Sequence, residues 1–444
     1  MKDIFDVIII GSGPAGMFAA EELAGKDISV LIIERGDEPA LREDMNYGIG
    51  GAGTFSDGKL NLTSKIGGNP ASFGRTEDEI ETMIQKVDDV FTAVGAKGGY
   101  SGLNDKGSME LKRKAHSVGV EFIYGKQRHI GTDVLHIIID NFYKKLAAEK
   151  NITFLKNEKV VNIAGSPQAF VITTEKKEYT GKNVIAAPGR AGSYWLREQV
   201  KHIGVTTAYG PIDVGIRVEF PYEIYDKIAD VMYDAKFRLY SKSFDDLVRT
   251  FCTNPRGYIV KEKYDEFVLV NGHAKRDSKT VNTNFALLSR VSLTNPVEDS
   301  TSYGRDMARM AMTIGGGKPI IQRLSDLLNG RRSTWGRLNK SAIAPTLTDV
   351  TPGDIGMVFP HRIVRNLIEG ITVLDEIIGG LLSNNTLLYA PEIKFYDTNY
   401  KVTSEMETTC DNFFVAGDAS GHSRGIVYAA VTGMVAAEGV MNKL

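Results

Sequence analysis

The sequence predicts an α/β fold in which both ends of the chain build one domain and the middle builds another. Residues 4–10 form a β-branched apolar run that ends at a glycine turn. An apolar repeat of helical period then covers 14–24 and a second apolar run covers 28–34, so this opening segment is expected to be a strand–helix–strand unit. Residues 412–417 form another buried-strand pattern, and residues 425–442 form another helical pattern. We expect this closing strand and helix to join the opening unit.

Between these ends the pattern changes twice. A glycine-rich stretch covers 48–68, and from about 192 to 370 strands alternate with helices, which is typical of a mixed α+β domain. The expected helices cover residues 76–94, 108–117, 132–150, 305–313 and 361–378, and the expected strands cover residues 152–155, 159–163, 170–174, 184–187, 213–220, 267–270 and 284–293. We therefore expect a first domain made of residues 1–190 and 375–444, and an inserted second domain made of residues 191–374.

Length and composition suit a globular protein with a small-molecule partner. The chain has 444 residues, of which 42% are hydrophobic and 24% charged, so disorder is not expected. Lysine and arginine total 53 against 55 acidic residues, and the formal net charge is only -2. A charge this small creates no strong field for a nucleic acid or an anionic membrane, so neither is expected as a partner. The oligomeric state is not readable from these numbers.

Cysteine usage indicates a reducing compartment. Cys252 and Cys410 are the two cysteines of the sequence, and they are not arranged as CxxC. Neither a disulfide framework nor a zinc cluster is expected, and no metal site is predicted. The first apolar run is too short for a signal core or a membrane span and no basic segment precedes it. We expect a cytoplasmic location.

The turn after the first strand carries a phosphate-binding motif. It satisfies GxGxxG, it follows a strand, and it opens a helix, which is the context of a dinucleotide site. Gly11 permits the tight turn, Gly13 lets the backbone approach a pyrophosphate, and Gly16 lets helix and strand pack closely. Glu34 ends the second strand, where its carboxylate can accept hydrogen bonds from both ribose hydroxyls. The alternative is a glycine turn without a ligand, next to a surface glutamate. The cofactor contacts expected here come from Gly11, Ser12, Gly13, Pro14, Ala15, Gly16, Glu34 and Arg35.

The closing strand ends in Gly417-Asp418, and a helix begins near Gly425. This arrangement resembles flavoproteins of the glutathione-reductase type, in which such an aspartate approaches the ribityl chain. The resemblance implies a discontinuous FAD-binding Rossmann domain that holds FAD without a covalent bond. The helix start at Gly425 and Ile426 would face the flavin pyrimidine, where negative charge accumulates on reduction. The alternative is a loop with a solvated aspartate.

The segment Asn183-Val-Ile-Ala-Ala-Pro-Gly189 is similar to the strand and turn that precede the substrate domain of such enzymes. A proline interrupts the usual small-residue turn and removes one backbone N–H. We expect Ala187 and Gly189 to be backbone neighbours of the cofactor, with a purely structural turn as the alternative.

Further stretches extend the resemblance along the chain. They cover residues 50–59, 128–133, 249–252, 389–395 and 417–425. Together they resemble a bacterial family of FAD-dependent dehydrogenases with largely unassigned substrates, which is distantly similar to geranylgeranyl reductases and aromatic hydroxylases. The resemblance implies that Gly51 lies near FAD, that Arg128 reaches the pyrophosphate side, that Thr132 caps the following helix, and that the backbone of Val160 or Val161 contacts adenine.

Some features of the relatives are missing from the sequence. The Asp-Gly motif with which hydroxylases bind FAD and NADPH has no convincing counterpart, the CxxC of disulfide reductases is absent, and no second dinucleotide-binding fold follows the first. If NAD(P)H donates electrons, it is therefore expected to visit the flavin only transiently.

Hydride chemistry belongs to the flavin, so the protein must supply orientation, a proton donor or acceptor, and exclusion of water. The candidate catalytic residues are His422, Cys252, His129 and Arg249. Other residues expected near the ring or the substrate are Ser56, Asp57, Lys59, Arg276, Ser423 and Arg424. Each type also has an ordinary structural role: a histidine that fills space, a cysteine that acts as a small buried hydrophobe, or an arginine that pairs with a surface carboxylate.

These expectations describe an FAD-dependent oxidoreductase, a dehydrogenase or reductase that transfers hydride between flavin and a small organic substrate. Two alternatives stay open. One is an oxygen-using flavin monooxygenase or oxidase, and the other is a non-catalytic protein whose FAD only stabilises the fold.

Overall fold

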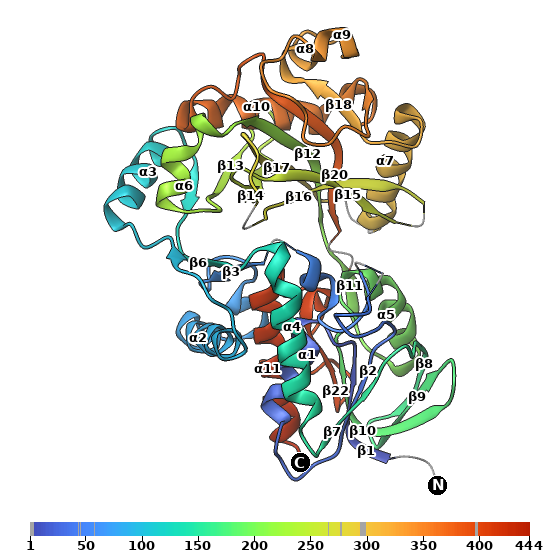
Figure 1. Cartoon of the computed structure of the whole chain (residues 1–444). Coiled ribbons are helices and arrows are strands. Elements are labelled where there is room, and N and C mark those ends of the chain that lie inside the picture. The colour runs from blue at the N-terminus through green and yellow to red at the C-terminus, as the bar shows by residue number, and fades with distance from the viewer. Residues whose placement is uncertain are drawn as a thin grey trace. The chain divides into compact units, whose positions relative to one another are not determined.

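A computed structural model of the chain shows two compact units (Figure 1). It describes residues 4–444 except 43, 45, 57, 265, 276–277, 294–298 and 396–397. The candidates Asp57 and Arg276 therefore lie outside the described residues. Unit 1 comprises residues 1–99, 128–210 and 396–444, and unit 2 comprises residues 100–127 and 211–395.

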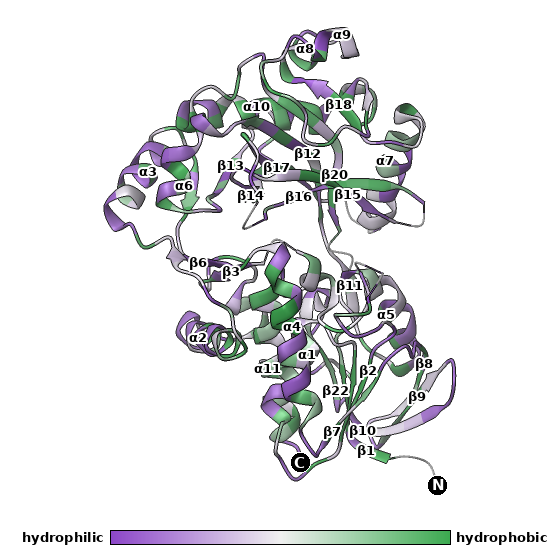
Figure 2. Cartoon of the chain, viewed as in Figure 1, coloured by the Kyte–Doolittle hydropathy of each residue, from purple (hydrophilic) through white to green (hydrophobic). Residues whose placement is uncertain are grey.

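Unit 1 is built on a sheet whose centre is parallel. Its strand order is β7-β2-β1-β10-β9-β8, and β22 also pairs with β10. The strands are β1 (Ile4–Ile10), β2 (Val30–Ile33), β7 (Ile152–Leu155), β8 (Val160–Ser166), β9 (Ala169–Thr174), β10 (Glu178–Ala186) and β22 (Phe413–Val415). Strand β2 is apolar throughout and fully buried (Figure 2). Such continuous apolar runs are expected of parallel strands with both faces covered.

Strand β10 is the junction of this sheet. One of its edges pairs in parallel with β1 from Thr180 to Ala186. Its other edge pairs first with β9, antiparallel over 178–181, and then with β22, parallel over 184–186. The closing segment of the chain therefore enters the sheet beside the opening one. The carboxyl ends of β1, β10 and β22 meet at one sheet edge.

Two helices pack on each other at this edge. Helix α1 (Pro14–Leu23) follows β1, and helix α11 (Ile426–Met441) is buried along almost its whole length. A Cβ atom at Gly433 would lie 2.0 Å from the carbonyl oxygen of Ala15, so the two backbones are in direct contact. Small residues on both helices permit this approach.

The other helices of unit 1 are α2 (Glu77–Ala93), α4 (Thr132–Ala147) and α5 (Ser193–Val200). Its short 3-10 turns are η1 (Gly51–Phe55), η2 (Pro70–Phe73), η3 (Arg190–Gly192), η4 (Lys201–Ile203) and η7 (Gly417–Ser420). Strand β11 (Thr207–Tyr209) pairs with β21 (Thr398–Tyr400), and β3 (Lys59–Leu62) pairs with β6 (Lys126–His129), which crosses the boundary at 127/128; β4 (Tyr100–Ser101) belongs to unit 2.

Unit 2 contains an eight-stranded, mainly antiparallel sheet. Its order is β19 (Thr351–Pro352), β18 (Ile320–Arg323), β20 (Leu387–Phe395), β12 (Ile212–Pro221), β17 (Asn282–Val291), β14 (Leu247–Asn254), β13 (Lys236–Tyr240), β5 (Glu121–Ile123). Strands β15 (Tyr258–Lys263) and β16 (Val268–His273) form a separate hairpin. The helices are α3 (Asp105–Ser117), α6 (Asp226–Val231), α7 (Ser300–Gly315), α8 (Leu324–Leu328), α9 (Trp335–Leu338) and α10 (His361–Ile378), with 3-10 turns η5 (Tyr222–Ile224) and η6 (Ile355–Met357).

The two faces of this sheet differ in polarity. Helix α10 packs on the apolar face, where a Cβ atom at Gly370 would lie 2.9 Å from the side chain of Val248 and 3.4 Å from that of Leu287. Side chains alternate between faces along a strand. The neighbouring positions Asp213, Arg217 and Arg249 therefore lie on the opposite, polar face.

The structure differs from the sequence-based expectations at the domain boundaries. The expected boundaries lie at 190/191 and 374/375, whereas the units meet at 210/211 and 395/396, and residues 100–127 belong to unit 2. Strand pairing explains the difference, because β11 pairs with β21 inside unit 1, while β20 pairs with β12 and β5 with β13 inside unit 2. None of these partners is close in sequence.

The expected N-cap role of Thr132 is wrong. Thr132 is the first residue of α4, and Gly131, with φ of 97°, occupies the capping position without a side-chain hydrogen bond.

Among the residues that the structure describes, no helix is both long and apolar enough to cross a membrane.

Candidate cofactor-binding site

The turn between β1 and α1 is shaped by contacts that only glycine permits. Gly11 has φ of 95°, and a Cβ atom there would lie 2.4 Å from the carbonyl oxygen of Ala187. A Cβ atom at Gly16 would lie 2.0 Å from the carbonyl oxygen of Gly11. Helix α1 begins with Pro14 after an N-cap glycine, Gly13, and no side chain caps it. Its first N–H groups and its dipole therefore favour an anion at this end.

The glycine-rich segment after β2 lies between the starts of two helices. A Cβ atom at Gly51 would lie 3.0 Å from Cα of Gly13. A Cβ atom at Gly53 would lie 3.4 Å from both Pro14 of α1 and Ile426 of α11. The 3-10 turn η1 thus contacts the N-terminal ends of α1 and α11 together.

Arg42 holds this segment, a role that sequence reasoning missed. Its Nη1 donates to the carbonyl oxygens of Ile49 and Gly51, each at 2.9 Å, and to Oγ1 of Thr54 at 3.0 Å. Burial lowers the pKa of Arg42 to about 10, which still leaves it charged at neutral pH. A lone arginine in an irregular loop gives no signal in the sequence.

Glu34 organises the loops around the turn. Its Oε2 accepts hydrogen bonds from N and Oγ of Ser12 at 3.0 and 2.8 Å, and its Oε1 accepts from N of Gly36 and N of Gly48 at 3.0 and 2.9 Å. The residue is almost fully buried. A carboxylate offers about four acceptor positions, so these contacts already use much of its capacity. Contact between Glu34 and a ribose stays a prediction. Arg35 is exposed and stacks over the ring of Tyr47 at 3.3 Å.

The closing segment reaches the same sheet edge. Ala187 N donates to Ile10 O at 2.8 Å, and Ala416 N donates to Ala186 O at 3.0 Å, which aligns the ends of β1, β10 and β22. Gly417, with φ of 72°, lies against α1, because a Cβ atom there would be 3.0 Å from Cβ of Ala15. Sequence reasoning therefore predicted correctly that residues from both chain ends meet.

Asp418 lies just beyond this turn and is partly exposed. Oγ of Ser423 donates to its Oδ1 at 3.1 Å, and Nε of Arg190 lies 3.5 Å from its Oδ2. Helix α11 follows with Gly425 as N-cap at φ of 84°, and no side chain caps it. The sites where Cβ atoms of Gly425 and Gly189 would lie are open space within 4 Å. A second uncapped helix start thus opens at the same edge.

His422 is held by its neighbours on both ring nitrogens. Nε2 lies 2.8 Å from the carbonyl oxygen of Tyr400, and Nδ1 lies 3.0 Å from Oγ of Ser72. Because a carbonyl only accepts, Nε2 carries the proton. The hydroxyl of Ser72 donates to the carbonyl oxygen of Asn69 at 2.7 Å and also faces Nδ1. Burial lowers the pKa of His422, so the imidazole is neutral at physiological pH.

Arg128 is buried in an ion pair. Its Nε and Nη2 donate to the two oxygens of Asp88 at 2.9 and 3.2 Å, and its Nη1 donates to the carbonyl oxygens of Ala96 and Gly98. These bonds connect β6 to α2 and the segment after it. The expected contact of Arg128 with a pyrophosphate stays a prediction. Next to it, His129 is half-buried.

The remaining unit 1 candidates are dispersed. Val160 is buried and Val161 is exposed at the start of β8. Ser56 Oγ donates to Gly53 O at 2.8 Å, and Lys59 is buried in β3. Arg424 donates through Nη1 to the carbonyl oxygen of Ser423.

Cys252 and Arg249 lie on strand β14 of unit 2. Cys252 has φ of 48° at a bulge, and its carbonyl oxygen accepts from Nη2 of Arg217 at 2.6 Å. Arg249 pairs with Asp213, with Nε 2.7 Å from its Oδ2. The structure therefore places these two candidates together, in a different unit from the glycine turns.

Asp213 is fully buried between Arg249 and Arg290. Burial alone would raise its pKa, but the two guanidinium groups lower it from 3.8 to about 2. The folded carboxyl thus has a lower pKa than the unfolded one. Its contribution to stability is present above about pH 4 and is lost as the pH falls toward about 2.

We expect Asp213→Asn to lower the free energy of unfolding by about 2 kcal/mol at neutral pH, the value that this pKa shift implies. The difference from the wild type should shrink as the pH approaches about 2. Urea unfolding of both proteins across this range measures it. The exposed Asp306→Asn variant serves as control and should cost almost nothing at any pH. A deficit for Asp213→Asn that does not change with pH would contradict the assignment.

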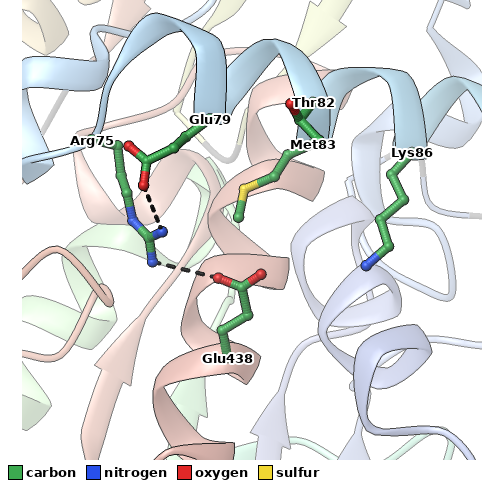
Figure 3. Close-up of a pocket in the computed structure, with 6 residues that line it drawn as sticks. All are labelled: Arg75, Glu79, Thr82, Met83, Lys86 and Glu438. Atoms are coloured by element: carbon green, nitrogen blue, oxygen red, sulfur yellow. Dashed lines mark hydrogen bonds and ion pairs between the residues drawn. The ribbon is translucent and has the colours of Figure 1, made fainter.

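A groove between α2 and α11 provides no further site (Figure 3). Arg75 pairs with Glu79 and with Glu438, each at 3.4 Å. Lys86 pairs with Glu22 at 2.7 Å. The charged side chains of the groove are thus paired with other protein groups. The groove also contains none of the glycine segments described above.

The fold and these glycine segments define a class of protein. A parallel sheet with a GxGxxG turn, whose edge also carries a second uncapped helix start from the far end of the chain, is the architecture of a dinucleotide-binding flavoprotein of Rossmann type. The family models agree with this description. Residues 9–43 match the model of an NAD(P)-binding Rossmann-like domain, and residues 211–394 match the model of the FAD-dependent protein, C-terminal domain-like. Together the two matches show an FAD-dependent oxidoreductase whose cofactor is FAD.

Similar proteins are found among both sequences and structures. An uncharacterized protein of Clostridium beijerinckii is 26% identical, over 98% of this chain and 80% of that protein. The digeranylgeranylglycerophospholipid reductase of Methanosarcina acetivorans is 55% identical over 50 residues, which are 10% of this chain and 12% of the reductase. The glycine oxidase of Geobacillus kaustophilus has a TM-score of 0.44 and 13% identity, over 99% of this chain and 95% of that one.

Proposed function

We propose that the protein binds FAD without a covalent bond at the carboxyl edge of the unit 1 sheet and acts as a dehydrogenase or reductase on a small organic molecule. The observation that carries this proposal is the pair of uncapped helix starts, α1 and α11, which both contact η1. Two positive helix ends suit a cofactor with an anionic pyrophosphate at one end and a ring that gains negative charge at the other.

The described residues fit this cofactor. At Gly13, Gly189 and Gly425 few or no atoms lie within 4 Å of the missing Cβ positions, which leaves room for a ligand beside the backbone. We assign the pyrophosphate to Gly11, Ser12, Gly13, Pro14, Ala15, Gly16 and Arg128, and the adenosine to Glu34, Arg35 and Val161. Gly51, Ala187 and Gly189 are assigned as further neighbours of the cofactor, and Gly417, Asp418, Gly425 and Ile426 to the ribityl chain and flavin. Of these, Asp418 is the partly exposed carboxylate at the edge, held by Ser423 and Arg190.

FAD, when bound, supplies the hydride chemistry. The protein's part is to bind, to orient and to handle protons. The geometry favours a positioning role for His422, because both ring nitrogens have protein partners and the ring lies against Phe73. His129, Cys252 and Arg249 remain proposals for contact with substrate, and NAD(P)H remains a proposed transient donor. Both cysteines are free thiols, which suits the proposed cytoplasmic location.

The relatives named as reductases support only the reaction direction. Their match covers 50 residues, so their lipid substrate is not proposed for this protein.

One experiment distinguishes the proposed dehydrogenase or reductase from the oxygen-using alternative. The holoenzyme is reduced anaerobically with dithionite and then mixed with air, and the flavin absorbance is followed. Slow reoxidation supports the proposal, whereas reoxidation within milliseconds or a hydroperoxide absorbance would favour a monooxygenase or oxidase.

We expect Asp418→Ala to retain FAD more weakly while the fold is kept. Loss of one charge-assisted acceptor corresponds to about a tenfold weaker affinity. FAD content after gel filtration and the dissociation constant of the reconstituted variant measure this change. Asp89→Ala on the exposed side of α2 is the matched control and should keep its FAD. A fully yellow Asp418→Ala protein with unchanged affinity would refute the role of Asp418.

A further inference from the structure

The polar face of the unit 2 sheet gathers cationic side chains. The register places Arg249 on β14 opposite Leu288 on β17, and Arg238 on β13 opposite Arg249. Arg290 on β17 lies opposite Asp213, and Lys394 on β20 lies opposite Asp213 on its other side. Because side chains alternate along each strand, these residues share one face.

Three of the cations surround one aromatic ring. The ammonium groups of Lys236 and Lys394 lie 5.0 and 5.9 Å from the ring centroid of Phe251, and the guanidinium of Arg249 lies 5.1 Å from it. Lys236 and Lys394 are buried, whereas Phe251 is partly exposed. A charged group at a low-dielectric, partly exposed surface interacts more strongly than one in water.

Carboxylates on this face do not balance the cations. Among the described residues, six cations are ion-paired there, namely Arg217, Lys236, Arg238, Arg249, Arg290 and Lys394. Their partners are four carboxylates, Glu121, Asp213, Asp234 and Glu392. The nearby carboxyl of Glu219 accepts hydrogen bonds from Tyr389 and Thr346, and burial raises its pKa; counted with the other four it still leaves six cations against five carboxyl groups. The face therefore carries a positive excess.

Two of these cationic side chains, Arg238 and Arg290, are partly exposed to solvent. The side chains of Arg238 and Arg290 are 41% and 37% exposed, and Glu121 lies 3.8 Å from Arg238 at the rim. Burial lowers the pKa of Arg238, the carboxylate of Glu121 raises it, and the positive charges of Arg249 and Arg290 lower it. Three guanidinium groups close enough to repel each other favour a bound anion that relieves the repulsion.

We infer that this face is the binding site of a small organic carboxylate, whose charged group pairs with Arg238, Arg249 and Arg290 and whose carbon skeleton lies on the ring of Phe251. Planar guanidinium groups match a carboxylate in bidentate geometry. The inference names a substrate class for the proposed oxidoreductase and rests on that proposal for its catalytic meaning. The binding itself depends only on unit 2.

Benzoate is a suitable probe because it combines a carboxylate with a flat apolar ring, and benzamide is its neutral counterpart. Calorimetric titration of the holoenzyme should show benzoate binding that weakens with salt, and benzamide binding at least about tenfold weaker. Equal affinities, or no binding of benzoate, would overturn the inference.

Single variants locate the site. Arg238→Gln, at a partly exposed side chain, should be tolerated, whereas Arg290→Gln also removes one partner of the buried Asp213 and should lower the stability. Each variant is expected to weaken benzoate about tenfold, and Phe251→Leu should also weaken it. Arg309→Gln on exposed α7 is the matched control and should bind benzoate as the wild type does. Thermal unfolding verifies that each variant is folded. Variants that bind like the control would refute the site.

The benzoate-binding result can be distinguished from a failure of the proposed oxidoreductase function. Benzoate binding by a protein whose FAD no donor reduces would keep the carboxylate site and refute the oxidoreductase reaction. Reduction of the flavin by metabolites, together with no benzoate binding, would keep the reaction and refute the site.

Discussion

Gly16→Ala is expected to remove most of the FAD and to destabilise unit 1. The new Cβ atom would lie 2.0 Å from the carbonyl oxygen of Gly11, which is backbone and cannot swing away. Helix α1 must therefore shift from β1, and overpacking of this kind costs about 3 kcal/mol. The shift also displaces the helix start that contacts η1. FAD content after purification and the free energy of unfolding in urea measure the two effects.

Gly99→Ala is the matched control for this prediction. Gly99 has no atom within 4 Å of its missing Cβ position and needs no left-handed backbone. Its substitution should leave both FAD content and stability almost unchanged. A Gly16→Ala protein that is as yellow and as stable as Gly99→Ala would show that α1 does not pack on β1 as described.

Arg217→Met is expected to destabilise the protein by about 3 to 5 kcal/mol, the cost of removing one partner of a buried ion pair. Arg217 is fully buried, and its Nη1 lies 3.1 Å from Oε1 of Glu392. Its Nε donates to Oδ1 of Asn284 at 2.8 Å, so this buried oxygen would keep only the longer hydrogen bond from Asn254, at 3.4 Å. Methionine keeps much of the volume and removes the charge, which isolates the electrostatic effect from a cavity effect.

The control for this variant is Arg309→Met. Arg309 pairs with Glu266 and Asp306 on the exposed side of α7. Exposed pairs contribute at most about 1 kcal/mol, so the control should unfold near the wild-type urea midpoint. If both variants unfold at the same midpoint, the pair between Arg217 and Glu392 does not stabilise unit 2.

Local patterns in the sequence predicted much of unit 1. The bounds of β1, β7 and α10 agree with expectation to the residue. Each of these elements has a clear repeat, either a continuous apolar run or an apolar stripe of helical period. The meeting of the two chain ends was also predictable, because each end carries a glycine turn that follows a buried strand.

Non-local pairing explains what was missed. Strand β5 belongs to unit 2 because it pairs with β13, far along the chain. Three residues of mixed polarity give no periodic signal, so this excursion of the chain was invisible. The same holds for the small pair of β11 and β21, which moved the domain boundary.

The candidate site follows the same division. The glycines were predictable because their spacing reports a turn that only glycine can make. The environment of His422 was not, since its partner Ser72 comes from a distant part of the chain. Arg42 and the second partner of Asp213, Arg290, were missed because nothing in the sequence marks which arginine meets which acceptor.

The backbone contact between α1 and α11 has a consequence for biosynthesis. Helix α1 leaves the ribosome long before Gly433, which fills the space beside Ala15, is made. Until then the apolar surface of α1 has no permanent cover, and such surface promotes aggregation of nascent chains. Maturation of the FAD-binding unit must therefore wait until α11 has been made, and products that stop before α11 should depend on chaperones to stay in solution.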